Sequence, residues 1–250
     1  MRIQVVVAPV FGTNCCVVVA DPPSRAAAGD ARSDAGPRDC VIVDAGAGVA
    51  DAVSSLVAAE NLVPRAVLAT HGHADHIWDA AELCARYDVP LRLHAADAYR
   101  LADPFGSLGV TGAPGVSGAL AHALADLGLH AEDYRSPGVV EPFDGASGTI
   151  MAGDVVLRTL HAPGHTEGST LYLVDDAGAA GAGASGVVLA GDVLFAGSIG
   201  RTDLPGGDPA VMQATLRDVV ATLDPSLAVV PGHGPATSVG HELATNPFLN

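Results

Sequence analysis

The sequence predicts an α/β (α+β) chain arranged as a four-layer αββα sandwich. Short β-rich runs alternate with segments of helical periodicity along the chain. The alternation occurs twice, as strands, helix, strand, helix and then as strands, helix, strand. Hydrophobic residues make up 49% of the 250 residues, which is enough for a sizeable core. Two similar halves, each a sheet with helices on its outer face, bury most apolar surface when the sheets pack together.

The first half contains most of the predicted β-structure next to two helices. The helix over 48–62 is predicted because Val49, Val53, Leu56 and Val57 lie on one helical face. The polar segment 22–38, rich in Gly, Pro and Ala, is predicted to be a long loop. The expected elements are strands over 2–9, 15–21, 40–46, 65–70 and 90–97 and helices over 48–62 and 75–88.

The second half begins with a new series of strands after a Gly-rich, aperiodic segment. That segment, 103–122, is interpreted as a loop and a candidate lid, and the low-complexity run 177–186 as the tip of a hairpin. Asp208 is the expected N-cap of the last helix, with Pro209 at its first position. The expected elements are a strand series over 147–165, strands over 169–176, 186–195 and 227–236, and a helix over 208–223.

Charge and cysteine content exclude several classes of function. A formal charge of −16 with a pI near 4.7 repels phosphate backbones, so we expect no nucleic-acid partner. No run reaches the roughly 18 apolar residues of a membrane span, and the N-terminal segment does not resemble a signal peptide. Cys15, Cys16, Cys40 and Cys84 form no CxxC pair, so we expect buried free thiols and a cytoplasmic protein. The oligomeric state is left open.

The segment "THGHADH" carries the strongest chemical pattern of the chain. His71, His73, Asp75 and His76 follow the apolar run "RAVLA" and form an H-x-H-x-D-H pattern. Side chains at i and i+2 lie on one side of extended backbone, so the first two histidines can converge on one ion. Asp75 and His76 begin the next helix and point toward a second position. Imidazole and carboxylate ligands suit zinc, manganese or iron.

Three more candidate ligands lie where apolar strands end in tight turns. His165 and His233 each follow a Pro-Gly pair, and Asp192 ends the run "VLAGD". Loops held by rigid strands are suited to a preorganised site. A structural role is the alternative for each residue taken singly. We expect non-ligand roles for the remaining histidines with less suggestive spacing, His94, His122, His130, His161 and His241.

The order of the segments "THGHADH", "APGHTEGS", "AGDVLF" and "PGHGPATS" resembles the metallo-β-lactamase superfamily. The segments "GSIGRTDLPGGD" and "GHELATNPFL" are similar to those of short glyoxalase II-like thioesterases. The αββα sandwich is also the fold that this resemblance implies. We expect one domain over 1–250, without the C-terminal helical domain that binds glutathione in longer glyoxalase II enzymes.

The resemblance implies two divalent metal ions, with zinc as the first expectation and iron or manganese as alternatives. The implied ligands of one metal are His71, His73 and His165; those of the second are Asp75, His76 and His233, with Asp192 bridging. Asp75 and Asp192 are the candidate catalytic residues, because Asp75 can also orient the attacking water. Asp44 is expected to support the ligands, with an Asx turn as its alternative role. Arg201 is expected either to contact a substrate carboxylate or to pair with Asp203.

The implied activity is hydrolysis of a small-molecule S-acyl thiol, such as an S-lactoyl thioester. A thiolate leaving group needs little protonation, and the chain has no GxSxG nucleophile motif. The first alternative is a persulfide dioxygenase, a mono-iron oxidoreductase of the same fold. A lactonase or a β-lactamase is the further alternative. The number of metal ions per chain distinguishes the thioesterase, with two zinc ions, from the persulfide dioxygenase, with one iron.

Overall fold

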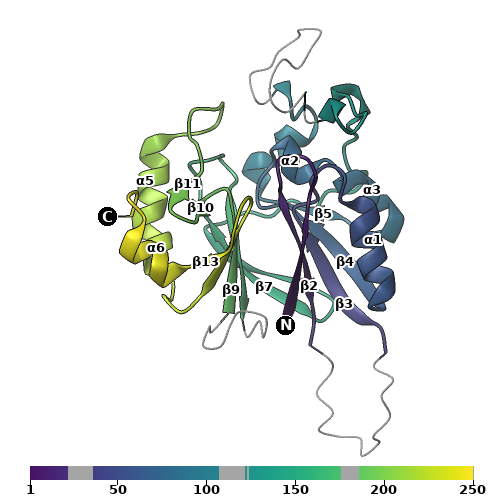
Figure 1. The fold of residues 1–250 in the computed structure, drawn as a ribbon, viewed down its shortest axis with the longest axis horizontal. Helices are drawn as coiled ribbons and strands as arrows, with labels where there is room; N and C mark the ends of the chain where they lie inside the picture. Colours follow the sequence, from purple (N-terminus) through teal and green to yellow (C-terminus); the bar gives the residue numbers. More distant parts are fainter. Residues whose placement is uncertain (22–35, 107–121, 123, 176–185, 250) are drawn as a thin grey trace, which may run out of the picture.

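Two β-sheets face each other, and helices cover the outer face of each, in a computed structural model of the chain (Figure 1). The structure describes residues 1–21, 36–106, 122, 124–175 and 186–249. The resulting order of layers is helix, sheet, sheet, helix, so the predicted αββα sandwich is confirmed.

The first sheet is mixed and has the strand order β1-β2-β3-β4-β5. The first three strands pair antiparallel, and β3, β4 and β5 pair parallel. Its strands are β1 (Arg2–Val7), β2 (Asn14–Val19), β3 (Arg38–Val43), β4 (Leu62–Leu68) and β5 (Leu91–Arg92). The β2 and β4 runs are rich in valine and other apolar residues, as expected for strands covered on both faces.

The second sheet has the strand order β13-β12-β9-β8-β7-β6. Its strands are β6 (Ser147–Ala152), β7 (Val155–His161), β8 (Thr170–Asp175), β9 (Gly186–Gly191), β12 (Ala228–Pro231) and β13 (Thr237–Ser238). A separate ribbon pairs β10 (Leu194–Phe195) with β11 (Ser198–Ile199). Because β7, β9 and β12 run in the same direction, their carboxyl ends lie at one edge of the sheet.

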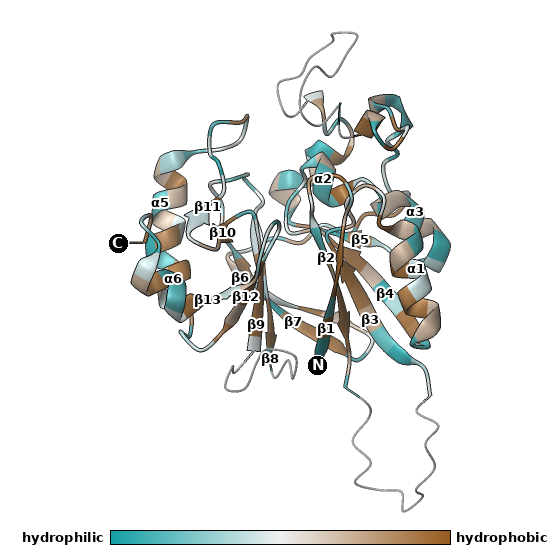
Figure 2. Ribbon diagram, in the orientation of Figure 1, coloured by the Kyte–Doolittle hydropathy of each residue, from teal (hydrophilic) through white to brown (hydrophobic). Residues whose placement is uncertain are grey.

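The helices lie on the outer faces and alternate between hydrophobic and hydrophilic residues, whereas the strands are mainly hydrophobic (Figure 2). The α-helices are α1 (Ala50–Ala59), α2 (Ala74–Ile77), α3 (Ala80–Tyr87), α5 (Pro209–Asp218) and α6 (Val239–Thr245). Short 3₁₀ helices are η1 (Ala95–Leu101), η3 (Ala131–Asp133) and η4 (Val220–Thr222). Asp208 caps α5 by accepting hydrogen bonds from the amides of Ala210 and Val211, as predicted.

Three apolar cores separate the four layers. The central core packs Val18, Val41 and Leu68 of the first sheet against residues such as Leu157 and Tyr172 of the second. A second core joins the first sheet to α1 and α3, and a third joins the second sheet to α5 and α6. The apolar surface buried on both faces of both sheets is the main stabilising contribution to the fold.

Several elements differ from the sequence prediction. The helix expected over 75–88 is divided into α2 and α3 around Trp78 and Asp79, because the Asp79 amide donates to the Ala45 carbonyl outside the helix. The Asp79 carboxylate accepts a hydrogen bond from the amide of Ala50. The strand expected over 90–97 is confined to β5 and is followed by η1. Most of the candidate lid over 103–122 lies outside the described residues, as does nearly all of the loop over 22–38 and of the hairpin tip over 177–186.

All four cysteines are free and buried, as predicted. Burial raises the pKa of each thiol, to about 12 for Cys40 and Cys84. Within the described residues, no helix is both long enough and apolar enough to cross a membrane.

Candidate metal centre

The ends of strands from both sheets bring seven candidate ligands to one edge of the sandwich. The loop after β4 supplies His71 and His73, and α2 supplies Asp75 and His76. The second sheet supplies His165 after β7, Asp192 after β9 and His233 after β12. The residues thus converge although they are up to 162 positions apart in the sequence, which is the separation of His71 and His233.

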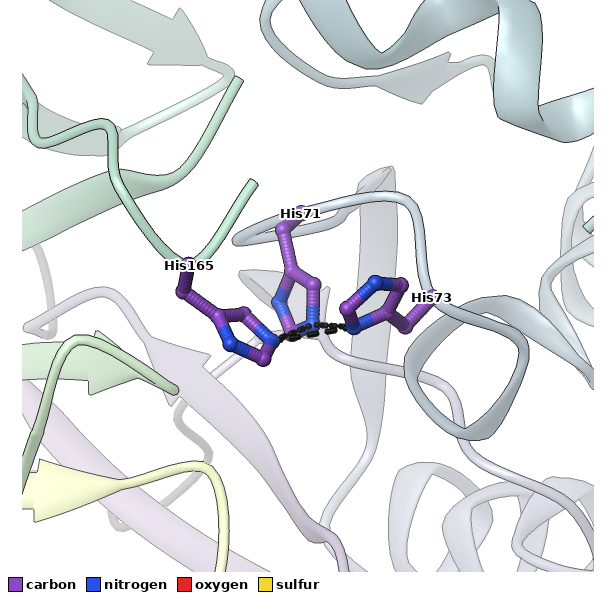
Figure 3. A group of neighbouring side chains, drawn as sticks. All are labelled: His71, His73 and His165. Carbon is purple, nitrogen blue, oxygen red and sulfur yellow. Dashed lines mark hydrogen bonds between the residues drawn. The ribbon is translucent and has the colours of Figure 1, made fainter. Parts of the chain in front are cut away.

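The first cluster, here called the three-histidine group, consists of His71, His73 and His165. Figure 3 shows their ring nitrogens directed toward a common point. His71 Nε2 lies 3.0 Å from His73 Nδ1 and 3.2 Å from His165 Nε2. His165 Nε2 lies 2.9 Å from His73 Nδ1. Nitrogens bound tetrahedrally to zinc at its usual Zn–N distance stand about 3.3 Å apart, which is close to this spacing.

Hydrogen bonds on the far side of two rings fix their tautomers. His165 donates from Nδ1 to the Arg201 carbonyl at 2.8 Å. The Thr70 hydroxyl donates to the Asp44 carboxylate at 2.9 Å, so its oxygen is left to accept from His71 Nδ1 at 3.1 Å. Each of these two rings therefore keeps the Nε2 lone pair directed into the cluster.

The second cluster, here called the mixed group, consists of Asp75, His76 and His233. His233 Nε2 lies 3.2 Å from both His76 Nε2 and Asp75 Oδ2. His233 donates from Nδ1 to the Phe11 carbonyl at 3.0 Å. His76 Nδ1 lies 3.1 Å from Asp44 Oδ2. These outward partners aim both Nε2 atoms at the Asp75 carboxylate.

Asp192 lies between the two groups. Its Oδ1 is 3.3 Å from His76 Nε2. Its Oδ2 is 3.6 Å from both His165 Nε2 and His233 Nε2. Oδ2 thus lies near one histidine of each group, which is the arrangement needed for a carboxylate that bridges two cations. Gly232 allows this approach, because a Cβ there would lie 2.1 Å from Asp192 Oδ1.

The protonation states implied by burial suit metal binding. Burial lowers the pKa of His71 and His165, and that of His73 to about 3, so these rings are neutral near pH 7. Burial alone would raise the pKa of Asp75 and Asp192, but the neighbouring histidines, with His76 contributing most, together outweigh it and lower the pKa of each. Metal ions bind neutral imidazole and ionised carboxylate.

The mixed group differs in the pKa of its histidines. Burial acts against a positive charge on His76, but the carboxylates of Asp44, Asp192 and Asp75 raise its pKa. For His233 burial has the same opposing effect, and its hydrogen bond to Asp75 raises the pKa. A bound cation would take the place of these protons among the same carboxylates.

The residues present fit divalent metal ions. The Nε2 atoms of His71 and His165 lie 3.2 Å apart, and the Nδ1 proton of each ring is already donated elsewhere, so no proton lies between them. The buried Asp192 Oδ1 has no hydrogen-bond partner. Unpaired buried polar atoms are costly, and a cation satisfies both the facing lone pairs and this oxygen.

The side chain of Arg201 pairs with a neighbouring carboxylate on the protein surface. Its exposed guanidinium donates to both carboxylate oxygens of Asp203 at 2.7 Å. The ion pair that the sequence left as an alternative is therefore present. Its backbone carbonyl, and not its side chain, reaches the site by accepting the His165 hydrogen bond.

The structure adds supporting residues that sequence reasoning did not select. Asn14 donates to the carbonyls of Pro231 and Gly234, on either side of the turn that carries His233. Asp97 accepts hydrogen bonds from the amides of Gly72 and Gly168, in the two loops that carry the three-histidine group. No local pattern identifies either residue, because their partners lie 25 to 220 positions away. The stacked pair His94 and His161 lies outside the candidate groups found among the described residues.

A family model described as "Metallo-beta-lactamase superfamily" matches residues 34–233. An uncharacterized protein of Mycobacterium tuberculosis (strain ATCC 25618 / H37Rv) is 37% identical over 211 residues, which cover 84% of this chain and 87% of that protein. The probable metallo-hydrolase YqgX of Bacillus subtilis (strain 168) is 35% identical over 211 residues, with the same shares covered, 84% and 87%.

More distant relatives and solved structures match nearly the whole chain. The hydroxyacylglutathione hydrolase GloC of Haemophilus influenzae is 27% identical over 251 residues, covering 100% of this chain and 99% of that protein. The B3 metallo-β-lactamase BLEG-1 has a TM-score of 0.74 and 29% identity, with 100% of both chains covered. TTHA1623 in a di-iron-bound form has a TM-score of 0.68 and 29% identity, with 98% of this chain and 100% of that chain covered.

Proposed function

The chain belongs to the metallo-β-lactamase superfamily, and we propose that it is a thioesterase with two metal ions. Its similarity to a probable metallo-hydrolase supports a hydrolytic activity. It hydrolyses S-acyl derivatives of a small thiol, in the manner of glyoxalase II enzymes. The observation that carries the proposal is the pair of ligand groups joined by Asp192. Full-length similarity to a hydroxyacylglutathione hydrolase supports the same class of substrate.

The proposed metal ligands are the seven residues of the sequence prediction. The three-histidine group would hold one cation, the mixed group would hold the second, and Asp192 would contribute to both sites. Two divalent cations bound there would supply an activated water at neutral pH and polarise the substrate carbonyl. Asp44 supports the ligands through Thr70 and His76, from which it lies 2.7–3.1 Å away.

The chain's own residues orient the water and keep the ligands in their reactive forms. Asp75 Oδ2 lies 3.2 Å from His233 Nε2, and its side chain is 17% exposed, so solvent reaches it. We assign Asp75 to accept a hydrogen bond from the attacking water. Asp192 keeps the two groups at a fixed separation, and Asp44 and the Arg201 carbonyl hold His76 and His165 in orientation.

The leaving group explains why a dedicated general acid is unnecessary. A thiol with a pKa near 8.5 departs as thiolate with little protonation. An amide or alkyl ester leaves a more basic group and requires a proton donor. The proposed preference is therefore for thioesters over lactones and β-lactams.

The test combines metal analysis with turnover of four substrate types. Purified protein is loaded in turn with Zn²⁺, Fe²⁺ and Mn²⁺, and metal content is measured by mass spectrometry. Turnover is then measured on S-lactoylglutathione, an S-lactoyl derivative of a smaller thiol, glutathione persulfide and a β-lactam. We expect about two metals per chain and fastest turnover of a thioester. The smaller thiol separates recognition of the acyl group from recognition of glutathione.

A matched pair of histidine variants links turnover to the proposed ligands. His233→Ala removes a ligand of the mixed group, whereas His241→Ala changes an exposed histidine outside all candidate groups. We expect the first to lose one metal and most turnover, and the second to behave as wild type. One iron per chain together with rapid persulfide oxidation would instead assign a persulfide dioxygenase. Rapid hydrolysis of the β-lactam would instead assign a β-lactamase.

A further inference from the structure

We propose that the buried carboxylate of Asp97 is the positioning residue of the three-histidine group. It ties together the two loops that carry these histidines and so sets the distance between them. The inference rests on the proposed metal centre, because it assigns a role toward the metal that the three histidines would hold. Asp97 touches neither metal nor substrate in this role; it acts through the backbone of the ligand loops.

The carboxylate of Asp97 is fully buried and accepts hydrogen bonds from two distant loops. Its Oδ2 accepts from the Gly72 amide at 2.8 Å and from the Thr166 hydroxyl at 2.8 Å. Its Oδ1 accepts from the Gly168 amide at 2.7 Å. Asp97 itself is 0% exposed and lies on η1, a third segment.

The positions of these donors connect Asp97 to the ligands. Gly72 is the residue between His71 and His73, and Thr166 directly follows His165. One carboxylate therefore binds the backbone between His71 and His73 and the side chain of the residue that follows His165. The two loops come from different sheets, so Asp97 fixes a distance that the strands of a single sheet do not fix. Charge-assisted hydrogen bonds of this kind are short and strong.

The charge of Asp97 is balanced within the same cluster. Arg100, whose side chain is 0% exposed, directs its Nε toward Asp97 Oδ1 at 3.4 Å. The Arg100 guanidinium also forms an ion pair with Glu167 and donates to the Pro205 carbonyl at 3.0 Å. A buried carboxylate without such a partner would be strongly destabilising. The arginine thus allows a full negative charge to remain close behind the ligand loops.

Glycine at two donor positions allows this close packing. A Cβ on Gly168 would lie 2.6 Å from the Asp97 Cγ, and a Cβ on Gly72 would lie 2.9 Å from the Arg100 Cβ. Both distances are too short for real side chains, so a larger residue would push η1 away from the loops. The central glycine of the H-x-H motif is therefore explained by contact with η1 as well as by the turn.

Asp39 offers a matched control elsewhere in the fold. Its carboxylate accepts from an arginine, Arg65 Nε at 2.7 Å, and from a backbone amide, that of Asp154 at 2.9 Å. Its side chain is 12% exposed. Asp39 lies near the amino end of β3, whereas Asp44 and the metal centre lie beyond the carboxyl end. A purely structural role for Asp97 predicts the same consequences as loss of the Asp39 carboxylate.

The test compares Asp97→Asn with Asp39→Asn in the full chain. Asparagine keeps the shape of aspartate, but its amide nitrogen cannot accept the hydrogen bonds that one of the two carboxylate oxygens accepts. Zn²⁺ affinity and stoichiometry are measured by competition with a chromophoric chelator. The visible absorption of Co²⁺-loaded protein reports ligand geometry, and thermal unfolding of the metal-free protein reports stability. We expect Asp97→Asn to weaken binding at one of the two metals by roughly 10- to 100-fold and to change the Co²⁺ spectrum.

Asp39→Asn should lower the unfolding temperature while leaving metal affinity and the Co²⁺ spectrum as in wild type. If Asp97→Asn also lowers only the unfolding temperature and keeps the metal affinity and the Co²⁺ spectrum of the wild type, the positioning role is wrong. Should Asp97→Asn fail to fold, Thr166→Val removes a single hydroxyl donor and leaves the buried ion pair intact. Wild-type metal affinity in that variant would then overturn the proposal.

The readouts separate this inference from the proposed function. Wild-type protein that binds two metals without hydrolysing thioesters contradicts the proposed reaction, while a selective defect in Asp97→Asn still supports the positioning role. Wild-type protein that binds neither Zn²⁺ nor Co²⁺ contradicts both. If the wild-type protein hydrolyses thioesters and Asp97→Asn binds metal as the wild type does, the proposed function is supported and only the role of Asp97 is contradicted.

Discussion

The two ligand groups of the candidate centre differ in burial and in chemistry. The members of the three-histidine group are at most 4% exposed, and all are neutral imidazoles. In the mixed group, the side chains of His233 and Asp75 are 25% and 17% exposed. The first group is therefore enclosed and uncharged, whereas the second contains a carboxylate and is partly exposed to solvent, although its His76 is 0% exposed. We infer that the first mainly holds its metal and that the second receives water and substrate.

The supports behind the two groups differ in the same way. The three-histidine group is held by the fully buried, charged Asp97. The turn of His233 is held by the neutral amide of Asn14, through hydrogen bonds of 2.9 and 3.0 Å to carbonyls. Hydrogen bonds to a charged group contribute more than those between neutral groups. The turn of His233 is thus anchored by weaker hydrogen bonds than the loops of the three-histidine group, whereas His76 of the mixed group lies against the carboxylate of Asp44.

Removing the bridge should have the largest effect, because Asp192 belongs to both groups. We expect Asp192→Ala to lower kcat/KM for the thioester by at least about 10³-fold, since metal activation is worth several kcal/mol and each 1.4 kcal/mol is a factor of ten. Metal content should also fall below two per chain. Steady-state kinetics and mass spectrometry measure these effects. Two tightly bound metals in this variant would show that the groups bind independently.

Removing one ligand from each group should reveal their difference. We expect His165→Ala and His233→Ala each to bind one metal, because each breaks one group and leaves the other. The metal kept by His233→Ala, in the enclosed group, should be released more slowly to a chelator than the metal kept by His165→Ala. Stopped-flow chelation measures both rates. Equal rates would contradict the inference that burial distinguishes the groups.

A smaller effect is expected from the pH dependence of the metal-free protein. The pKa values of His76 and His233 are raised and those of His71, His73 and His165 are lowered. As the pH falls, the mixed group should therefore take up protons first, and the three-histidine group should stay neutral into the acid range. Imidazole ¹⁵N chemical shifts measure this order. Protons compete with metal, so the mixed group should also release its metal at the higher pH. Release of both metals at one pH would argue against this difference.

The sequence predicts the αββα layers and the convergence of the seven candidate ligands well. Each ligand comes shortly after an apolar strand, and such strand ends share an edge of a sheet. The prediction was poorer where local pattern competes with tertiary contact. The helix over 75–88 is periodic throughout, yet it divides at Asp79, whose carboxylate caps α1 instead. Only the folded chain reveals this competition.

The supporting residues could not be predicted for a related reason. Asp97 is the last residue of the segment 90–97, "PLRLHAAD", for which the sequence predicts a strand. Its function depends on contacts with Gly72 and Gly168, which lie 25 and 71 positions away. A single sequence carries no information on such partners unless they form a short motif. The ribbon of β10 and β11 and the helix α6 were also missed, because each is too short to show periodicity.

The hydrogen bonds of Asn14 and Phe11 to the His233 turn also determine when the centre can be completed. During synthesis on a ribosome, residues 1–165 emerge with the three histidines already present, but the mixed group lacks its last member. Asn14 and Phe11 of the N-terminal hairpin must wait for a segment made more than 200 residues later before these hydrogen bonds are formed. A chain truncated before β12 would lack His233, so its mixed group would stay incomplete and these groups of the hairpin would keep no partner in the turn.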